Sequence, residues 1–444
     1  MNRAIYRLVR FNNIARAWLS QQLTPSGFAL LCGLFVFGLI GLDIKRSISY
    51  QGFVFLLVIL FVSIVLSRFK RNRLSTARKL PRFGTVGSAL QYRIVINNKG
   101  CRPQHGLALT ESFSNTFPSF RTFQRMVRNG KNAKKDRNEW FRLLARRRWA
   151  IAPTILLPSL AAKGETEVTA EIIPIRRGLL RFQKLTLACP DPLGLVNRCF
   201  TFSQPQSVLI LPQRYELPTI QLPGSRRHQA DGLALATSIG DSEEFRALRE
   251  YRPGDSPRKI HWKSWAKLGK PVIKEEQEEY SVRHALILDT FQAEDYSEVM
   301  EEAVAIAASL ACTVQTQESL LDLVFVSDQA HSFTIGRGLG QTEQLLELLA
   351  SAQPCQDKGF EKMLPLVRSR LSLLSGCICI FLTWDEDRKA LIEQLQSASV
   401  PVLVLIIATE QGLSEPPDHS CLQDSQSSLH VLTLGNIQSG LLAL

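Results

Sequence analysis

The hydrophobic pattern begins with two uninterrupted apolar runs near the N-terminus. Residues 24–42 and 51–67 carry no charged side chain, and each run is about 17–19 residues long. This length is close to what a helix needs to cross the hydrocarbon core of a bilayer. Thr24 can cap the first helix, and Pro25 suits its first turn. The pattern therefore predicts a two-helix transmembrane hairpin over residues 24–67.

Positive charge flanks the two runs on their outer sides. Four arginines precede the first run, and six Lys or Arg side chains follow the second between residues 68 and 79. Because basic residues favour the cytoplasmic side of a membrane, this predicts two spans with both termini and the bulk of the chain in the cytoplasm. Residues 1–23 mix apolar side chains with arginines, which fits an amphipathic helix on the inner leaflet or a solvated helix.

Short stretches of alternating apolar and polar residues follow from 82 to 213 and predict a β-sandwich-like domain. A basic insertion, residues 114–152, interrupts them and holds most of the formal net charge of +13. Next to a membrane anchor we expect it to touch acidic headgroups. Nucleic acid is the weaker alternative, because no recognition motif accompanies the charge. The candidate contacts to an anionic surface are Lys134, Lys135, Arg146, Arg147 and Arg148.

From residue 281 to 444, apolar strands alternate with helical patterns, which predicts a doubly wound α/β domain. Binding sites in such sheets lie at the carboxyl ends of the strands. Asp289 and Asp385 each follow a predicted strand and so point to that edge. Two acids there can hold a divalent metal or cap helix starts, but Phe291 and Ala293 offer no side-chain oxygen. We therefore treat Asp289 and Asp385 as a degenerate metal site.

Residues 241–280 contain the densest pattern of charge and tryptophan, EFRALREYRPGDSPRKIHWKSWAKLGK from 244 to 270. Its Pro-Gly turn precedes a helix that is expected to stop at Gly269. Arginine forks near carboxylates, with Trp262 and Trp265 as an apolar anchor, suggest a clasp that locks two domains or presents a face to a partner. The clasp residues are Arg246, Arg249, Tyr251, Arg252, Gly254, Asp255, Arg258 and Trp262.

Catalytic chemistry is not evident. Asp255, His261 and Ser264 are the candidates in the signature, but their spacing aligns no nucleophile with a base. The nine cysteines form no CxxC, which indicates reduced, structural thiols. We expect no enzyme activity and no cofactor.

The signature FRALREYRPGDSPRKIHWKSWAKLGKPVIKEE resembles the defining motif of the bacterial domain-of-unknown-function family fifty-eight, a MoxR-associated family. PIRRGLLRFQKLTLACPDPLGLVNR resembles its second motif, with Leu193 where the family has Phe. The resemblance extends over nearly the whole chain. It implies a membrane protein with a von Willebrand factor A-like C-terminal domain. A metal-binding A-like domain would carry Asp-x-Ser-x-Ser, from which Asp289, Phe291 and Ala293 depart.

The resemblance also implies partners: a MoxR-type AAA+ ATPase and a transglutaminase-like membrane protein. The leading expectation is a non-enzymatic accessory or scaffold protein of the bacterial inner membrane that serves assembly of a cell-envelope or protein complex. One alternative is a protein that binds anionic lipid or nucleic acid through the basic insertion. The other is a metal-dependent enzyme, or an adhesion-type metal site, at Asp289 and Asp385.

Overall fold

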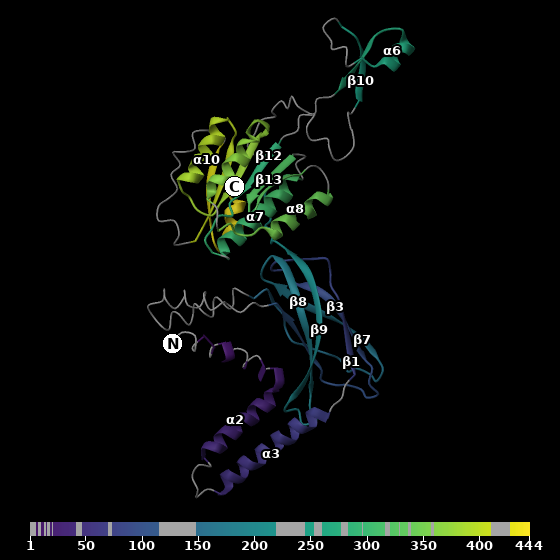
Figure 1. The fold of residues 1–444 in the computed structure, drawn as a ribbon, viewed down its shortest axis with the longest axis vertical. Helices are drawn as coiled ribbons and strands as arrows, with labels where there is room; N and C mark the ends of the chain where they lie inside the picture. Colours follow the sequence, from purple (N-terminus) through teal and green to yellow (C-terminus); the bar gives the residue numbers. More distant parts are fainter. Residues whose placement is uncertain are drawn as a thin grey trace. The chain divides into compact units, whose positions relative to one another are not determined.

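The computed structural model forms two compact units. The first comprises Met1–Gln213 with Leu349–Ser351, and the second comprises Arg214–Leu348 and Ala352–Leu444 (Figure 1). The described residues are short pieces of 6–19 and the ranges 21–40, 47–69, 73–114, 148–218, 245–252, 260–276, 283–294, 296–315, 320–327, 329–335, 339–356, 359–409 and 427–444. Most of the amphipathic segment 1–23 and of the basic insertion 114–152 therefore lies outside them.

Both apolar runs form helices. α3, Ser47–Phe69, contains a stretch, Ile48–Arg68, that is long and apolar enough to cross a membrane, and it is the one such helix in the described part of the chain. α2, Pro25–Ile40, is also apolar but has 16 residues, fewer than a membrane span needs; the last two residues of the predicted run 24–42 lie outside the described ranges. Large apolar side chains point outward on both helices, which suits a hydrocarbon environment.

Two sheets share one core in the β-rich part of the first unit, as the alternating pattern predicts. One sheet has the order β1-β3-β7-β5 and the other β2-β9-β8-β4-β6. All pairs are antiparallel except β2 with β9. The strands are β1 Leu74–Lys79, β2 Phe83–Thr85, β3 Leu90–Asn98, β4 Ala108–Phe113, β5 Ala150–Ile151, β6 Ile155–Leu156, β7 Glu165–Pro174, β8 Gly178–Pro190 and β9 Asn197–Leu211.

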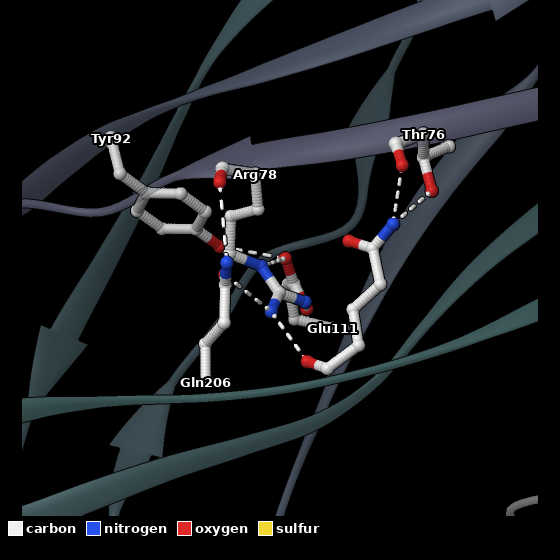
Figure 2. A network of polar contacts seen from close by, with 6 residues as sticks. Thr76, Arg78, Tyr92, Glu111 and Gln206 are labelled. Carbon is white, nitrogen blue, oxygen red and sulfur yellow. Dashed lines mark hydrogen bonds and ion pairs between the residues drawn. The ribbon is translucent and has the colours of Figure 1, made fainter.

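A charged network crosses this core (Figure 2). Arg78 of β1 donates to both carboxylate oxygens of Glu111 on β4, at 3.0 and 2.6 Å, and both residues are buried. The Tyr92 hydroxyl donates to the same carboxylate at 3.1 Å, and Arg78 also donates to the carbonyl of Gln204 on β9. Burial raises the pKa of Glu111, while Arg78 acts in the opposite direction. The network ties the strand that follows α3 to the opposite sheet.

The second unit holds a six-stranded sheet of order β14-β13-β12-β15-β16-β17, parallel except for β14. In chain order this is 3-2-1-4-5-6, a doubly wound arrangement whose direction reverses between β12 and β15. α9 and α10 contribute buried side chains to the hydrophobic core on one face of the sheet. α7 contacts β12, β13, β15 and β16 but contributes no side chain to that core. The strands are β12 Arg283–Leu288, β13 Leu320–Val326, β14 Ala330–Ile335, β15 Gly376–Phe381, β16 Val402–Ala408 and β17 Ser428–Thr433, and the helices are α7 Glu298–Gln315, α8 Leu339–Ser351, α9 Met363–Arg368, α10 Glu386–Ser397 and α11 Ile437–Leu442.

A small lobe of the second unit carries the signature. β10, Phe245–Glu250, pairs antiparallel with β11, Val272–Glu276, and α6, Trp262–Leu268, precedes β11. α6 ends at Gly269, whose φ of 67° is left-handed and whose amide donates to Trp265, so the predicted helix stop is confirmed.

We expect Arg78→Met to destabilise the β-sandwich by about 3–5 kcal/mol, because it leaves Glu111 buried without its counter-charge. Hydrogen exchange of the β3 and β4 amides in the detergent-solubilised chain should accelerate by about two orders of magnitude or more. Adding Glu111→Met and Tyr92→Phe should recover most of the loss. The control is Arg93→Met, whose 3.6 Å pair with Glu167 is exposed and should cost below about 1 kcal/mol. Equal effects of Arg78→Met and Arg93→Met would contradict the prediction.

Candidate functional site

The turn between β8 and β9 is organised around one carboxylate. Asp191 accepts hydrogen bonds from the amides of Leu193, Leu195 and Val196 at 3.2, 2.7 and 3.0 Å. Gly194 takes the left-handed conformation that closes the turn, with a φ of 67°. We call residues 191–196 the Asp191 turn. The side chain of Asp191 is thus held in a single position by its own turn.

The same carboxylate binds the apolar helix α3. The Ser63 hydroxyl donates to Asp191 Oδ2 at 2.6 Å, and both residues are buried. Burial alone would raise the pKa of Asp191, but the hydrogen bonds from Ser63 and the turn amides outweigh it and lower that pKa below its usual value. An ionised carboxylate therefore joins the β-rich part to a residue inside the predicted span.

α2 contacts the other side of the turn at its first residues. The Thr24 hydroxyl lies 2.6 Å from the carbonyl oxygen of Gly194, and Ser26 donates to the same oxygen at 2.6 Å. A Cβ on Gly27 would lie 2.0 Å from the Leu195 carbonyl, so this close approach requires glycine. Thr24 also accepts from the Gly27 amide and so caps α2, as predicted.

The last turn of α3 is bound in the same region. Arg198, the second residue of β9, donates to the carbonyls of Ser67, at 3.0 Å, and of Arg68. Free carbonyls at a helix C-terminus favour such a cation. Asn197 donates to the Gln21 carbonyl ahead of α2. The Asp191 turn and the start of β9 therefore bind both helices through polar contacts.

A second cluster lies where the strand order reverses in the α/β sheet. Asp289 follows β12, is fully buried, and accepts from the amides of Phe291 and Leu382 at 3.0 and 3.1 Å. Two guanidinium nitrogens of Arg388 lie 2.8 and 2.7 Å from Asp289 Oδ2. Burial raises the pKa of Asp289, while Arg388 and the two amides act in the opposite direction. Arg388 is the counter-charge of Asp289.

The second predicted acid uses the same arginine. Asp385 caps α10 by accepting from the Arg388 amide at 3.1 Å, which confirms a helix-capping role, and it also pairs with the Arg388 side chain. The guanidinium stacks over the Phe360 ring, 4.6 Å from its centroid. No three described His, Cys, Asp or Glu side chains form a metal-binding group. A divalent ion does not fit here, because Arg388 already occupies both carboxylates.

The signature residues fall on different parts of the small lobe. Arg246 and Arg249 lie in β10, followed by Tyr251 and Arg252, while Trp262 begins α6. The carboxylate of Glu250 lies 3.4 Å from Lys270 Nζ in an exposed pair. Gly254, Asp255 and Arg258 are outside the described residues, as are Lys134, Lys135, Arg146 and Arg147 of the basic insertion; Arg148 is described and exposed.

The sequence pattern did not predict that His261 and Ser264 of the signature contact each other. His261 Nδ1 lies 2.7 Å from Ser264 Oγ, because the first turn of α6 brings residues three apart together. Both belong to that turn, so the pair has the geometry of a local contact at a helix start. The Asp191 turn was also missed as a site. The signal available in the sequence was Ser63, a polar residue inside the apolar run 51–67, and the structure shows that it is buried.

Together these features define a chain with apolar helices bound to a β-sandwich, and a second unit built on a doubly wound sheet. Residues 247–376 match the family "Protein of unknown function DUF58", so the chain carries a domain of this family, and the resemblance of the signature is confirmed. The match runs from β10 to the start of β15. It does not include the apolar helices or the second motif, over which the resemblance was also expected.

The chain is also similar to named proteins. It is 25% identical over 194 residues to "Uncharacterized protein YeaD" of Bacillus subtilis (strain 168), covering 43% of this chain and 46% of that protein. The chain thus spans about half the length of that relative. Crystal and solution structures of the CARDB domain of the PF1109 protein from Pyrococcus furiosus match 32% of this chain and 96% and 97% of theirs, at 16% identity and a TM-score of 0.18. A score this low supports no structural argument.

We expect Asp191→Asn to loosen the contact between the turn and α3, because charge-assisted hydrogen bonds contribute about 1.5–3 kcal/mol. Hydrogen exchange at residues 193–196 should accelerate by about tenfold or more. Ser67→Ala is the control, since the Ser67 hydroxyl bonds only within α3, to the Ile64 carbonyl. Because the pKa of Asp191 is lowered on folding, its contribution is present above about pH 4 and should be lost as the pH falls through the folded pKa. Unchanged exchange in Asp191→Asn would refute this.

We expect Arg388→Met to destabilise the α/β unit by about 3–5 kcal/mol, because Asp289 is then buried without a counter-charge. The unfolding midpoint of that unit reports the loss. Lys389→Met, which removes a half-buried lysine whose partner Glu386 is exposed, should change the midpoint much less. Millimolar Mg²⁺ or Mn²⁺ should leave the wild-type midpoint unchanged, since a ligand stabilises a fold only by binding it. A metal-dependent rise in the wild type would overturn our assignment of Arg388.

Proposed function

We propose that the chain is a non-enzymatic scaffold of the bacterial inner membrane, with α2 and α3 as a transmembrane hairpin and the remainder in the cytoplasm. The observation that carries this proposal is the binding of the Asp191 turn to both helices. A helix that only anchors a domain through a linker does not need specific contacts with that domain. Here the hydroxyls of Thr24, Ser26 and Ser63 all bind one turn of the β-rich part, as a rigid mount requires.

The contact between the helices supports a hairpin. Gly33 lies against Leu56, and Gly38 against Phe53. A Cβ on Gly52 would lie 3.1 Å from the Phe37 ring, so this side of α3 fits α2 closely. Small residues at helix contacts are the usual means by which helices pack within a bilayer.

We further propose that the α/β unit is von Willebrand factor A-like and serves in binding rather than catalysis. Its 3-2-1-4-5-6 strand order supports the fold. Arg388 supports a role without metal, because the acids at the carboxyl edge are bound to an arginine. This observation disfavours the alternative of a metal-dependent enzyme or adhesion-type site at Asp289 and Asp385.

The partner we propose is a MoxR-type AAA+ ATPase, with a transglutaminase-like membrane protein as a second candidate, on the resemblance of the signature. We propose that this partner contacts Arg252, which follows β10 and is exposed, and Asp255, which lies outside the described residues. Binding of anionic lipid or nucleic acid through the basic insertion remains the alternative function. Arg148, near the end of that insertion, is exposed, and this exposure does not favour lipid over nucleic acid as the ligand.

Two measurements test this function. A reporter fused to the C-terminus should be active only in the cytoplasm; activity outside the inner membrane would overturn the proposal. The detergent-solubilised chain should co-purify an AAA+ ATPase, identified by mass spectrometry, and Arg252→Ala with Asp255→Ala should reduce its recovery about tenfold. Arg181→Ala, an exposed arginine of β8, is the matched control. Unchanged recovery in the double variant would remove the signature as the docking face.

A further inference from the structure

The short helix α6 has two chemically distinct sides. At 100° per residue, Leu268, Trp265, Trp262 and Ala266 fall on one continuous arc of about 160°. Lys263 and Lys267 fall on the remaining side, as does Ser264. The helix is therefore amphipathic, although it has only seven residues.

Much of the apolar side of α6 is exposed in the described part of the second unit, although Trp265 is half-buried. The chain around α6 is joined to β11 through the His261 amide and a bridge between Ile260 and Ile273. Trp262 nevertheless remains 64% exposed and Leu268 63% exposed, the highest values for large apolar side chains among the described residues of the second unit. The rings of Trp262 and Trp265 stack with centroids 5.1 Å apart, which presents one aromatic surface.

The charge beside this surface is positive. Residues 260–270 contain three lysines and no acid. Lys270 pairs with Glu250, whereas Lys263 and Lys267 are exposed beside the apolar arc, with no described carboxylate in ion-pair contact. An occupant of this face must accept two tryptophans and a leucine and be negatively charged.

We propose that α6 docks on an anionic bilayer surface, with Trp262 and Leu268 among the acyl chains and Lys263 and Lys267 at the headgroups. Tryptophan beside lysine is typical of a helix that lies in a membrane interface. A stable protein interface needs roughly 800 Å² from each partner, contributed by about 20–30 residues, and four apolar residues on two turns of helix fall far short of that. A weak second contact suffices for a bilayer to which the chain is already attached, because attachment raises the local concentration.

This inference rests on the proposed membrane anchoring, and the test separates the two. The full chain is reconstituted into nanodiscs of phosphatidylcholine, with or without phosphatidylglycerol, that contain acyl-brominated lipid as a quencher of tryptophan fluorescence. The contribution of Trp262 is the difference between wild type and Trp262→Phe. We expect the brominated lipid to quench Trp262 fluorescence in discs that contain phosphatidylglycerol. This quenching should be lost at high salt and in discs of phosphatidylcholine alone.

Charge variants sharpen the result. Lys263→Gln with Lys267→Gln should lower the docked fraction of α6 about tenfold or more, whereas Lys362→Gln, an exposed lysine elsewhere in the unit, should leave it unchanged. Absence of any Trp262 contribution in anionic discs, while the chain stays in the disc, would overturn the docking of α6 and leave the anchor intact. Docking of α6 on the bilayer would also be overturned if the fluorescence of Trp262 changed only when a protein partner was added. Failure of the wild type and all variants to enter discs would overturn the anchor and this inference with it.

Discussion

The anionic carboxylate of Asp191 is the constraint on which the first unit depends. It must be ionised to accept three turn amides and a hydroxyl at once, and it is buried against an apolar helix. Such a group is tolerated only where its hydrogen-bonding capacity is filled. The turn amides and Ser63 fill it, and this fixes where α3 lies against the β-rich part. If α2 and α3 form the transmembrane hairpin that we propose, this contact holds the sandwich at the membrane surface in one orientation.

Each unit contains a buried arginine–carboxylate pair, one inside the sandwich core and one at the carboxyl edge of the α/β sheet. Arg78 and Glu111 join the two sheets of the sandwich, and Arg388 and Asp289 join α10 to the end of β12. Such pairs contribute little net stability compared with apolar packing, but removing one partner is costly. We therefore interpret them as devices that specify geometry. At the edge of the α/β sheet, Asp289 and Asp385 are two acids of the kind that bind a metal. Because Arg388 pairs with both, they form a structural contact instead.

The elements that could be predicted from the sequence are those governed by local periodicity. The two uncharged apolar runs form helices, as their length and composition predict. Alternation at period two places Tyr92, Ile94 and Ile96 on the buried face of β3. Gly269 ends α6 because a left-handed residue is required there. The doubly wound sheet follows from strands that alternate with helices, and the two acids reach the predicted edge because both follow strands at the carboxyl end.

The sequence alone determined the composition of the parts: two apolar helices, a strand-rich segment, an α/β unit and a signature that identifies the DUF58 domain. Only the tertiary structure decided which groups meet. Ser63 and Asp191 are 128 residues apart, and Asp289 and Arg388 are 99 residues apart. No periodicity relates residues at such separations, because their contact depends on how whole elements pack. The acids of the α/β edge are therefore visible in the sequence, and Arg388 is close to Asp385 along the chain, but only the fold shows that Arg388 also pairs with Asp289.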